Sequence, residues 1–246
     1  MLQLHDHERI DQLYAEDIQI IQSSEVFSFS LDAVLLANFP KIPKRGVIVD
    51  LCAGNGAVGL FVSRKTDAQI YQVELQEKLA DMAQRSIELN HLEEQMTVFQ
   101  IDLKDSLAHI THNSVDLLLC NPPYFKDVPT GIKNPNPHLA IARHELHTNL
   151  DEVLEMSSRL LKTNGRMALV HRPDRFLDIL NTMQKYRLAP KRVQFVYPKE
   201  GKEANILLVE ALKDGKTDGF KVAPPIITYD EKGEYTPIFR QMLYGE

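Results

Sequence analysis

The feature that most constrains the fold is a regular alternation of short apolar runs with amphipathic stretches, which begins at Val47. Short apolar runs between turn residues are typical of buried strands, and apolar residues spaced three and four apart are typical of helices on a core. Strands that alternate with helices predict parallel pairing with right-handed crossovers. We therefore expect an α/β protein with a doubly wound, mostly parallel, seven-stranded sheet of the Rossmann-like kind.

Two parts are expected along the chain: an N-terminal extension over 1–45, formed by an extended pair and a short helix, and one α/β domain over 46–246. The expected strands are 47–51, 69–75, 96–101, 115–120, 165–171, 193–197 and 206–212, the last two as a hairpin-like pair. The expected helices are 57–65, 77–90, a weak one over 104–110, one from a capping box at Thr148 and Asp151 to about Lys162, and 173–186.

Composition excludes several classes of protein. The chain has 246 residues, 43% of them apolar and 25% charged, as in ordinary globular domains. Its two cysteines, Cys52 and Cys120, have no CxxC spacing, so neither a disulfide framework nor a zinc site is expected. The N-terminus carries acids early and resembles no secretory signal, and no apolar run is long enough to span a membrane. The expected location is the cytoplasm.

The charge distribution leaves nucleic-acid binding open. A net charge of −6 argues against it, because contacts to phosphate need Lys and Arg. Residues 159–192 nevertheless contain nine basic residues and only two acids, Asp174 and Asp178. Such a segment is either a basic face or a set of scattered, solvated charges.

A glycine-rich turn joins the first expected strand to the first helix, with the sequence Asp50-Leu51-Cys52-Ala53-Gly54-Asn55-Gly56 and with Gly59 shortly after. Glycines let the backbone approach a ligand closely, and Glu74, at the end of the next strand, can accept both hydroxyls of a ribose. The same pattern matches the dinucleotide fingerprint of nicotinamide oxidoreductases. Two carboxylates favour S-adenosylmethionine over a dinucleotide. Asp50 suits the cationic amine of its methionine part better than it suits a pyrophosphate. Asp102, after the third strand, can accept a hydrogen bond from the adenine amino group. Asp102 would serve equally well as a helix cap.

The sequence Asn121-Pro122-Pro123-Tyr124 directly follows the fourth expected strand. Two prolines force the chain out of the sheet there. An amino nitrogen attached to an aromatic ring is a poor nucleophile because its lone pair is delocalised. The Asn121 side-chain oxygen and the Pro122 carbonyl can each accept one of its N–H bonds and so favour a pyramidal nitrogen. Tyr124 offers a flat face for stacking the base. This combination predicts methyl transfer from S-adenosylmethionine, with S-adenosylhomocysteine as product and no general base.

One further segment has a proposed use. Residues 125–142 form a long loop beside the tetrapeptide, where Phe125 and Lys126 are expected to contact the substrate. A disordered surface loop is the alternative.

The nine histidines do not predict a metal site, since the His144-Glu145-Leu146-His147 segment lacks the HExxH spacing. We interpret the histidines as surface or helix-edge residues.

Together these motifs resemble the amino-directed class I methyltransferases. The segment FSFSLDAVLLA at 27–37 and Ala142-Arg143-His144-Glu145 after the loop resemble one branch, the bacterial tRNA1(Val) adenine-N6 methyltransferase family, over roughly residues 10–245. One departure is visible: Cys52 stands where the wider class usually has glycine.

The resemblance implies a tRNA substrate, an adenine beside the anticodon as acceptor, and a role for each site residue. The N-terminal extension would pack over the cofactor. The implied cofactor contacts are Phe29, Ser30, Asp32, Asp50, Cys52, Ala53, Gly54, Asn55, Gly56, Glu74, Leu75, Asp102, Leu103 and Asn121. The implied catalytic residues are Asn121, Pro122, Pro123 and Tyr124, and the implied substrate contacts are Tyr124, Phe125, Lys126 and Arg143. Arg143 would contact substrate phosphate or form a buried ion pair.

Several other functions remain possible from the sequence. The first is N5-methylation of a protein glutamine, which uses the same tetrapeptide, although such enzymes carry a longer helical N-terminal domain. Guanine-N2 methylation of rRNA and adenine methylation of DNA follow. A nicotinamide oxidoreductase and a cofactor-binding RNA scaffold without enzymatic activity complete the alternatives. The sequence predicts no membrane partner and leaves the oligomeric state open.

Overall fold

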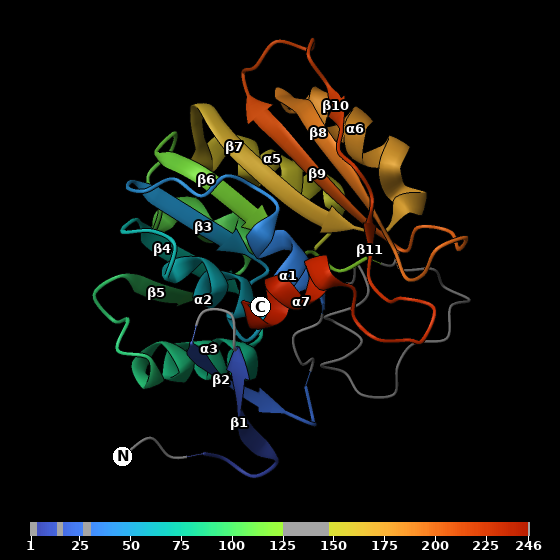
Figure 1. Cartoon of the computed structure of the whole chain (residues 1–246). Coiled ribbons are helices and arrows are strands. Elements are labelled where there is room, and N and C mark those ends of the chain that lie inside the picture. The colour runs from blue at the N-terminus through green and yellow to red at the C-terminus, as the bar shows by residue number, and fades with distance from the viewer. Residues whose placement is uncertain (1–3, 14–16, 27–30, 125–147, 246) are drawn as a thin grey trace, which may run out of the picture.

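The structure, a computed structural model, describes residues 4–13, 17–26, 31–124 and 148–245. A central twisted sheet is covered by helices on both faces (Figure 1). Its strands are β3 (Val47–Leu51), β4 (Gln69–Glu74), β5 (Met96–Gln100), β6 (Val115–Cys120), β7 (Leu161–His171), β8 (Leu188–Tyr197), β9 (Ile206–Lys213), β10 (Lys221–Val222) and β11 (Ile226–Ile227).

The strand order across the sheet is β10-β8-β9-β7-β6-β3-β4-β5, and β11 also pairs with β8. Strands β3, β4, β5, β6 and β7 run parallel to one another, whereas β9 runs antiparallel to both β7 and β8. The doubly wound, mostly parallel sheet and its closing hairpin-like pair are therefore confirmed. The described sheet has nine strands rather than the expected seven, because β10 and β11 pair over only two residues each and leave no periodic signal in the sequence.

The helices divide between the two faces of the sheet. They are α1 (Leu31–Asn38), α2 (Ala57–Ser63), α3 (Glu77–Leu89), α5 (Leu150–Leu160), α6 (Phe176–Lys185) and α7 (Pro237–Tyr244), with the 3-10 helices η2 (Leu103–Ala108) and η3 (Pro173–Arg175). One apolar cluster joins α1, α2 and α7 to the sheet, and a second joins α5 and α6 to the other face. Burial on both faces explains why the central strands read as continuous apolar runs.

The start and end of helix α5 differ from the sequence prediction. Its N-cap is Asn149, not Thr148: the Asn149 side chain accepts a hydrogen bond from the Glu152 backbone at 3.0 Å, and Glu152 accepts one from the Asn149 backbone at 3.2 Å. Both residues fit the capping-box pattern one position later than expected. The helix ends at Leu160, since Leu161 turns to extended backbone and pairs with Val115 as the start of β7.

The N-terminal segment forms a separate two-stranded antiparallel sheet of β1 (Glu8–Leu13) and β2 (Ile18–Ser23). Ile21 of β2 and Val26 pack against Leu79 and Met82 of α3, so the hairpin lies on the outer side of that helix (Figure 1). The expected extended pair and short helix are thus present as β1, β2 and α1. Among the described residues, none of the helices has the length and apolar character needed to cross a membrane.

Candidate active site

Parallel pairing brings most of the predicted site residues to one edge of the sheet. Strands β3, β4, β5 and β6 are adjacent and parallel, so the segments after their carboxyl ends meet there. The glycine turn follows β3, Leu75 follows β4, Asp102 follows β5 and Asn121 follows β6. This edge, at the point where the strand order reverses between β3 and β6, is where doubly wound sheets bind ligands.

Asp50, in β3, lies beneath the glycine turn and is fully buried. One carboxylate oxygen accepts a hydrogen bond from the Gly59 backbone at 3.1 Å, and the other has no hydrogen-bond partner. Burial raises the pKa of the carboxyl to about 7, against the opposing effect of the Gly59 hydrogen bond. Asp50 therefore holds the start of helix α2 and retains one acceptor that a cation could use.

The turn itself depends on left-handed backbone conformations. Gly54 has φ +58° and Gly56 has φ +86°, and a side chain on Gly54 would meet no atom within 4 Å. The turn thus leaves open space beside Gly54. Cys52 also adopts a left-handed conformation, with φ +59°. That conformation explains why glycine is favoured at this position, because a side chain there is strained.

Glu74 is buried at the end of β4, next to the turn. One of its carboxylate oxygens accepts from the Gly54 backbone at 2.8 Å and the other from the Gln76 backbone at 2.8 Å. Burial is the main cause that raises the pKa of this carboxyl. Leu75 beside it is 38% exposed, which is unusual for leucine and leaves an apolar surface at this edge.

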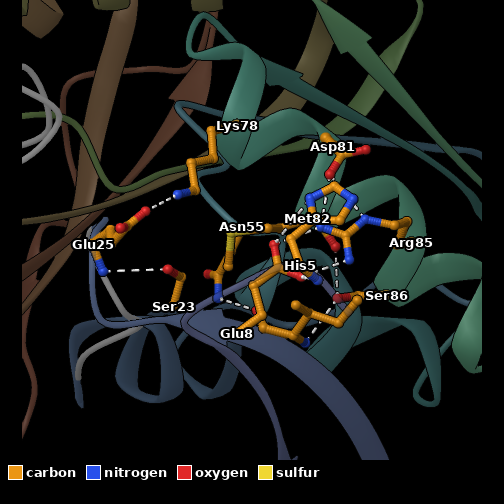
Figure 2. A network of polar contacts seen from close by, with 11 residues as sticks. His5, Glu8, Ser23, Glu25, Asn55, Lys78, Asp81, Met82, Arg85 and Ser86 are labelled. Carbon is orange, nitrogen blue, oxygen red and sulfur yellow. Dashed lines mark hydrogen bonds and ion pairs between the residues drawn. The ribbon is translucent and has the colours of Figure 1, made fainter. Parts of the chain in front are cut away.

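Asn55 connects the glycine turn to the N-terminal hairpin. Its side-chain amide donates to the Ile21 carbonyl of β2 at 3.1 Å, and Ala53 is held by a backbone bond to Val73. Figure 2 shows Asn55 among the polar contacts between the hairpin and α3. In the same network the Ser86 hydroxyl accepts from the Ile21 backbone at 3.0 Å. The hairpin therefore supports the turn from outside the sheet.

Ion pairs also join the first strand of the hairpin, β1, to helix α3. Arg85 of α3 donates two hydrogen bonds to the two carboxylate oxygens of Glu8, at 2.8 and 2.7 Å, and a third to Asp81 at 2.8 Å (Figure 2). His5 completes a group with Glu8 and Asp81 whose ligand-type atoms all lie within 4.8 Å of one another. Because the Arg85 guanidinium already binds both carboxylates, this group is better described as an ion-pair network than as a metal site.

Asp102 caps the 3-10 helix η2, where its carboxylate accepts from the Lys104 backbone at 3.0 Å. Leu103 follows it and is buried. The capping role was the alternative interpretation of Asp102 from the sequence. A cap uses one of the two carboxylate oxygens, so contact with an adenine amino group through the other stays a prediction.

The tetrapeptide leaves the sheet directly after β6, as its two prolines require. Pro122 is buried, and Asn121, Pro123 and Tyr124 are partly buried. The Tyr124 hydroxyl lies 2.9 Å from a carboxylate oxygen of Asp32 in α1, and it also donates to the side-chain oxygen of Asn121. Burial, followed by the neighbouring Asp32 carboxylate, raises the pKa of Tyr124 well above its usual value. Tyr124 therefore stays neutral and remains a hydrogen-bond donor.

His171 belongs to this site although the sequence analysis does not include it. It ends β7, is only 1% exposed and packs its ring 5.1 Å from that of Tyr124. Its Nδ1 accepts from the Arg172 backbone at 2.8 Å, while its Nε2 is buried without a hydrogen-bond partner. Burial lowers the pKa to about 3. The interpretation of the histidines as surface or helix-edge residues is wrong for His171. The sequence signal that points to His171 is its position at the carboxyl end of the expected strand 165–171.

Five of the predicted site residues lie outside the described residues, and their roles stay predictions: Phe29, Ser30, Phe125, Lys126 and Arg143. The same holds for the proposed substrate loop over 125–142 and for the segment from His144 to His147.

Comparison with protein families identifies the fold and its class of chemistry. The family model for the methyltransferase small domain matches residues 17–195, well over half of the chain. The chain belongs to this methyltransferase family. The match includes β2, α1, the glycine turn and the tetrapeptide, so the site described above lies within it.

Similar curated proteins carry the name that the sequence resemblance suggests. A tRNA1(Val) (adenine(37)-N6)-methyltransferase of Photobacterium profundum is 26% identical over 184 residues, 74% of this chain and 75% of the relative. Relatives with the same name from Bacteroides fragilis and Porphyromonas gingivalis are 29% and 26% identical, covering 69% and 90% of this chain and 70% and 89% of their own length. The family resemblance is confirmed, and the dinucleotide-dependent alternative is set aside.

Solved structures show the same fold at lower identity. A predicted O-methyltransferase from Agrobacterium tumefaciens superposes with a TM-score of 0.69 at 21% identity, over 87% of this chain and 96% of that one. TYW2 of Pyrococcus horikoshii, solved in complex with MeSAdo, gives 0.60 at 14% identity, over 86% of this chain and 73% of that one. A geranyl diphosphate C-methyltransferase from Streptomyces coelicolor, solved with S-adenosyl-L-homocysteine, gives 0.56 at 14%, over 74% and 75%.

Proposed function

We propose that this protein transfers a methyl group to the exocyclic N6 amino group of an adenine in tRNA, next to the anticodon. The observation that carries the proposal is the placement of Asn121 and Tyr124 beside the glycine turn, at the carboxyl edge of a methyltransferase sheet. Curated relatives named for this reaction support the choice of acceptor.

The donor is S-adenosylmethionine, which supplies an electrophilic methyl group when it is bound. Three observations on the turn fit such a molecule: open space beside Gly54, the unpartnered oxygen of Asp50, and the Glu74 carboxylate next to the turn. Asp50 would hold the methionine amine and Glu74 the ribose. A bound ammonium would also lower the raised pKa of Asp50 and keep it ionised.

The chain's own contribution to the reaction is to position the amine. Asn121 and the Pro122 carbonyl would accept its two N–H bonds, and a buried proline keeps that carbonyl fixed. In the structure the Asn121 oxygen accepts from the Tyr124 hydroxyl, so the incoming amine takes over an acceptor that is already aligned. Asp32 offers the displaced hydroxyl a second acceptor at 2.9 Å. Positioning of the reacting atoms then provides much of the rate acceleration.

The tyrosine ring would stack on the target base and hold it in line with the methyl group. A base within a stacked loop has to turn outward to reach this position. His171 packs against the Tyr124 ring from the adjacent strand, and its low pKa keeps it uncharged there. We propose that His171 fixes the orientation of the ring rather than transferring a proton.

The test is methyl transfer from labelled S-adenosylmethionine to unmodified bacterial tRNA, followed by nuclease digestion and identification of the labelled nucleoside. The expected product is N6-methyladenosine. Transfer to rRNA as N2-methylguanosine, or to a protein glutamine, would reject the proposed acceptor. Binding of the donor without transfer to any of these would instead support a role as an RNA scaffold.

A further inference from the structure

A polar cavity of about 410 Å³ lies at the opposite edge of the sheet from the tetrapeptide. Leu161 starts β7 beside the cavity and pairs with Val115, which starts β6, whereas the tetrapeptide follows the end of β6. The lining residues that matter come from α5, α6, the turn after α6, and β9 with the turn after it; they are Ser158, Arg159, Lys185, Arg187, Lys213 and Asp214.

Positive charge dominates this cavity. Four basic side chains reach it from different elements, and Asp214 is the single acid among the described lining residues. Asp214 lies 2.7 Å from Arg187, and Lys185 pairs with Asp151 at 2.7 Å. The carboxyl ends of α5 and α6 add a partial negative charge of about one half each. Even after these contributions, the cavity keeps an excess of positive charge.

Lys213 differs from most lysines because it is buried: only 6% of the residue is exposed. Its ammonium group donates to the Ser158 hydroxyl and lies 3.8 Å from Asp214. Burial lowers its pKa, and neighbouring Arg187 adds to that effect. A buried ammonium whose nearest carboxylate is beyond ordinary hydrogen-bond distance gains much from an anion in the adjoining space.

The cavity also changes the interpretation of the basic segment at 159–192. Arg159, Lys185 and Arg187 line the cavity, whereas Arg172 and Arg175 lie at the tetrapeptide edge after β7. Arg175 is buried and pairs there with Asp178. The segment therefore places basic side chains at two opposite edges of the sheet and does not form one continuous basic face.

We propose that this cavity is a second ligand site, which binds a phosphate group. Guanidinium groups match phosphate oxygens with paired N–H donors, and the Lys213 ammonium and Ser158 hydroxyl add further donors. A backbone phosphate of RNA and a free phosphate compound share this chemistry. The site goes beyond the proposed methyl transfer and does not depend on it.

The first measurement is calorimetric titration of the full chain with inorganic pyrophosphate. The test variant is Arg159→Gln/Arg187→Gln, and the matched control is Lys202→Gln/Lys232→Gln, which removes the same charge from exposed positions outside the lining. We expect the test variant to bind pyrophosphate at least tenfold more weakly and the control to bind it as the parent does. Pyrophosphate should also raise the pKa of Lys213, measured by side-chain NMR.

The second measurement is tRNA affinity as a function of salt concentration. Removing one basic side chain that neutralises a phosphate makes the slope of log K against log salt shallower by roughly 0.9 for a duplex. A shallower slope in the test variant alone identifies the ligand as an RNA phosphate, whereas an unchanged slope with loss of pyrophosphate binding identifies a free phosphate compound. Equal pyrophosphate binding by parent and test variant, with equal salt slopes, would overturn the proposal. Neither readout involves methyl transfer, so failure of the proposed function would be seen separately.

Discussion

The hydroxyl of Tyr124 lies 2.9 Å from a carboxylate oxygen of Asp32, which joins the tetrapeptide after β6 to helix α1. The same hydroxyl donates to Asn121, the residue expected to accept the target amine. A phenol has one hydrogen to donate, so Asp32 and Asn121 compete for it. The N-terminal part of the chain can thereby influence whether the Asn121 oxygen is free for the substrate.

This competition predicts a non-additive effect of two substitutions. Asp32→Ala leaves the Tyr124 hydroxyl with Asn121 alone, and we expect kcat for tRNA methylation to fall about tenfold, or roughly 1.4 kcal/mol. In the Tyr124→Phe background, where no hydroxyl competes, Asp32→Ala should have little further effect. Single-turnover rates of the four proteins measure this. A full tenfold loss in the Tyr124→Phe background would show that Asp32 acts elsewhere, for instance on the methyl donor.

Asn121→Ala should separate catalysis from donor binding. The substitution removes the side-chain acceptor for the amine but leaves the glycine turn unchanged, so turnover should drop by about 100-fold or more. The dissociation constant for S-adenosylmethionine, measured by calorimetry, should change by less than about threefold. Comparable losses in both quantities would contradict the assigned role. Asn181→Ala is a suitable control, because Asn181 is exposed on helix α6 and belongs neither to the tetrapeptide nor to the glycine turn.

Asp50 should make the stability of the donor-free protein depend on pH. Its pKa is about 7 in the folded state against 3.8 ordinarily, so the folded state binds more protons between these values. Stability contributed by this group is therefore lost as pH rises from 3.8 to 7, by at most about 1.4 kcal/mol per pH unit. Asp50→Asn lacks this loss, and its amide can donate to the unpartnered oxygen of Gln72, its register partner. Urea denaturation should find the variant more stable than the parent at pH 8 but not at pH 4. It should also bind S-adenosylmethionine more weakly.

His171 should give the opposite dependence. Its pKa is lowered from 6.5 to about 3, so the unfolded chain takes up a proton first as the pH falls. The associated stability is present above pH 6.5 and is lost on going down toward pH 3. His171→Phe removes this loss and keeps a ring against Tyr124, so its stability relative to the parent should rise between pH 6.5 and pH 4. An unchanged difference across that range would mean that His171 is not buried neutral. His171→Ala should lower kcat more than His171→Phe if the ring orients Tyr124.

Cys52→Gly should stabilise the protein by about 1 kcal/mol, because glycine adopts the left-handed conformation at φ +59° without a steric penalty. Cys52→Ala is the matched control, since alanine removes the thiol but keeps the strained Cβ. We expect no gain from it in urea denaturation. Equal stabilisation by both substitutions would assign the effect to the thiol rather than to the backbone.

The sequence alone determined the order of strands and helices from β3 to β9 and the chemical character of the edge. Apolar runs such as 115–120 are buried on both faces, so their pattern is strong, and the glycines and prolines permit few backbone paths. The capping box at α5 was misplaced by one residue because two overlapping pairs satisfy the same local rule. Local sequence could also not reveal β10 and β11, whose pairing exists only where β8 offers an edge.

Only the tertiary structure decided which distant residues meet. Asp32 and Tyr124 are far apart in the chain, and their contact depends on how α1 packs on the sheet. His171 acquires its low pKa from burial, and Lys213 becomes part of a cavity because two helices end beside β9. Burial and long-range contact are properties of packing, not of local pattern. The residue types of the active edge could therefore be read from the sequence, whereas their hydrogen bonds, their charge states and the second cavity could not.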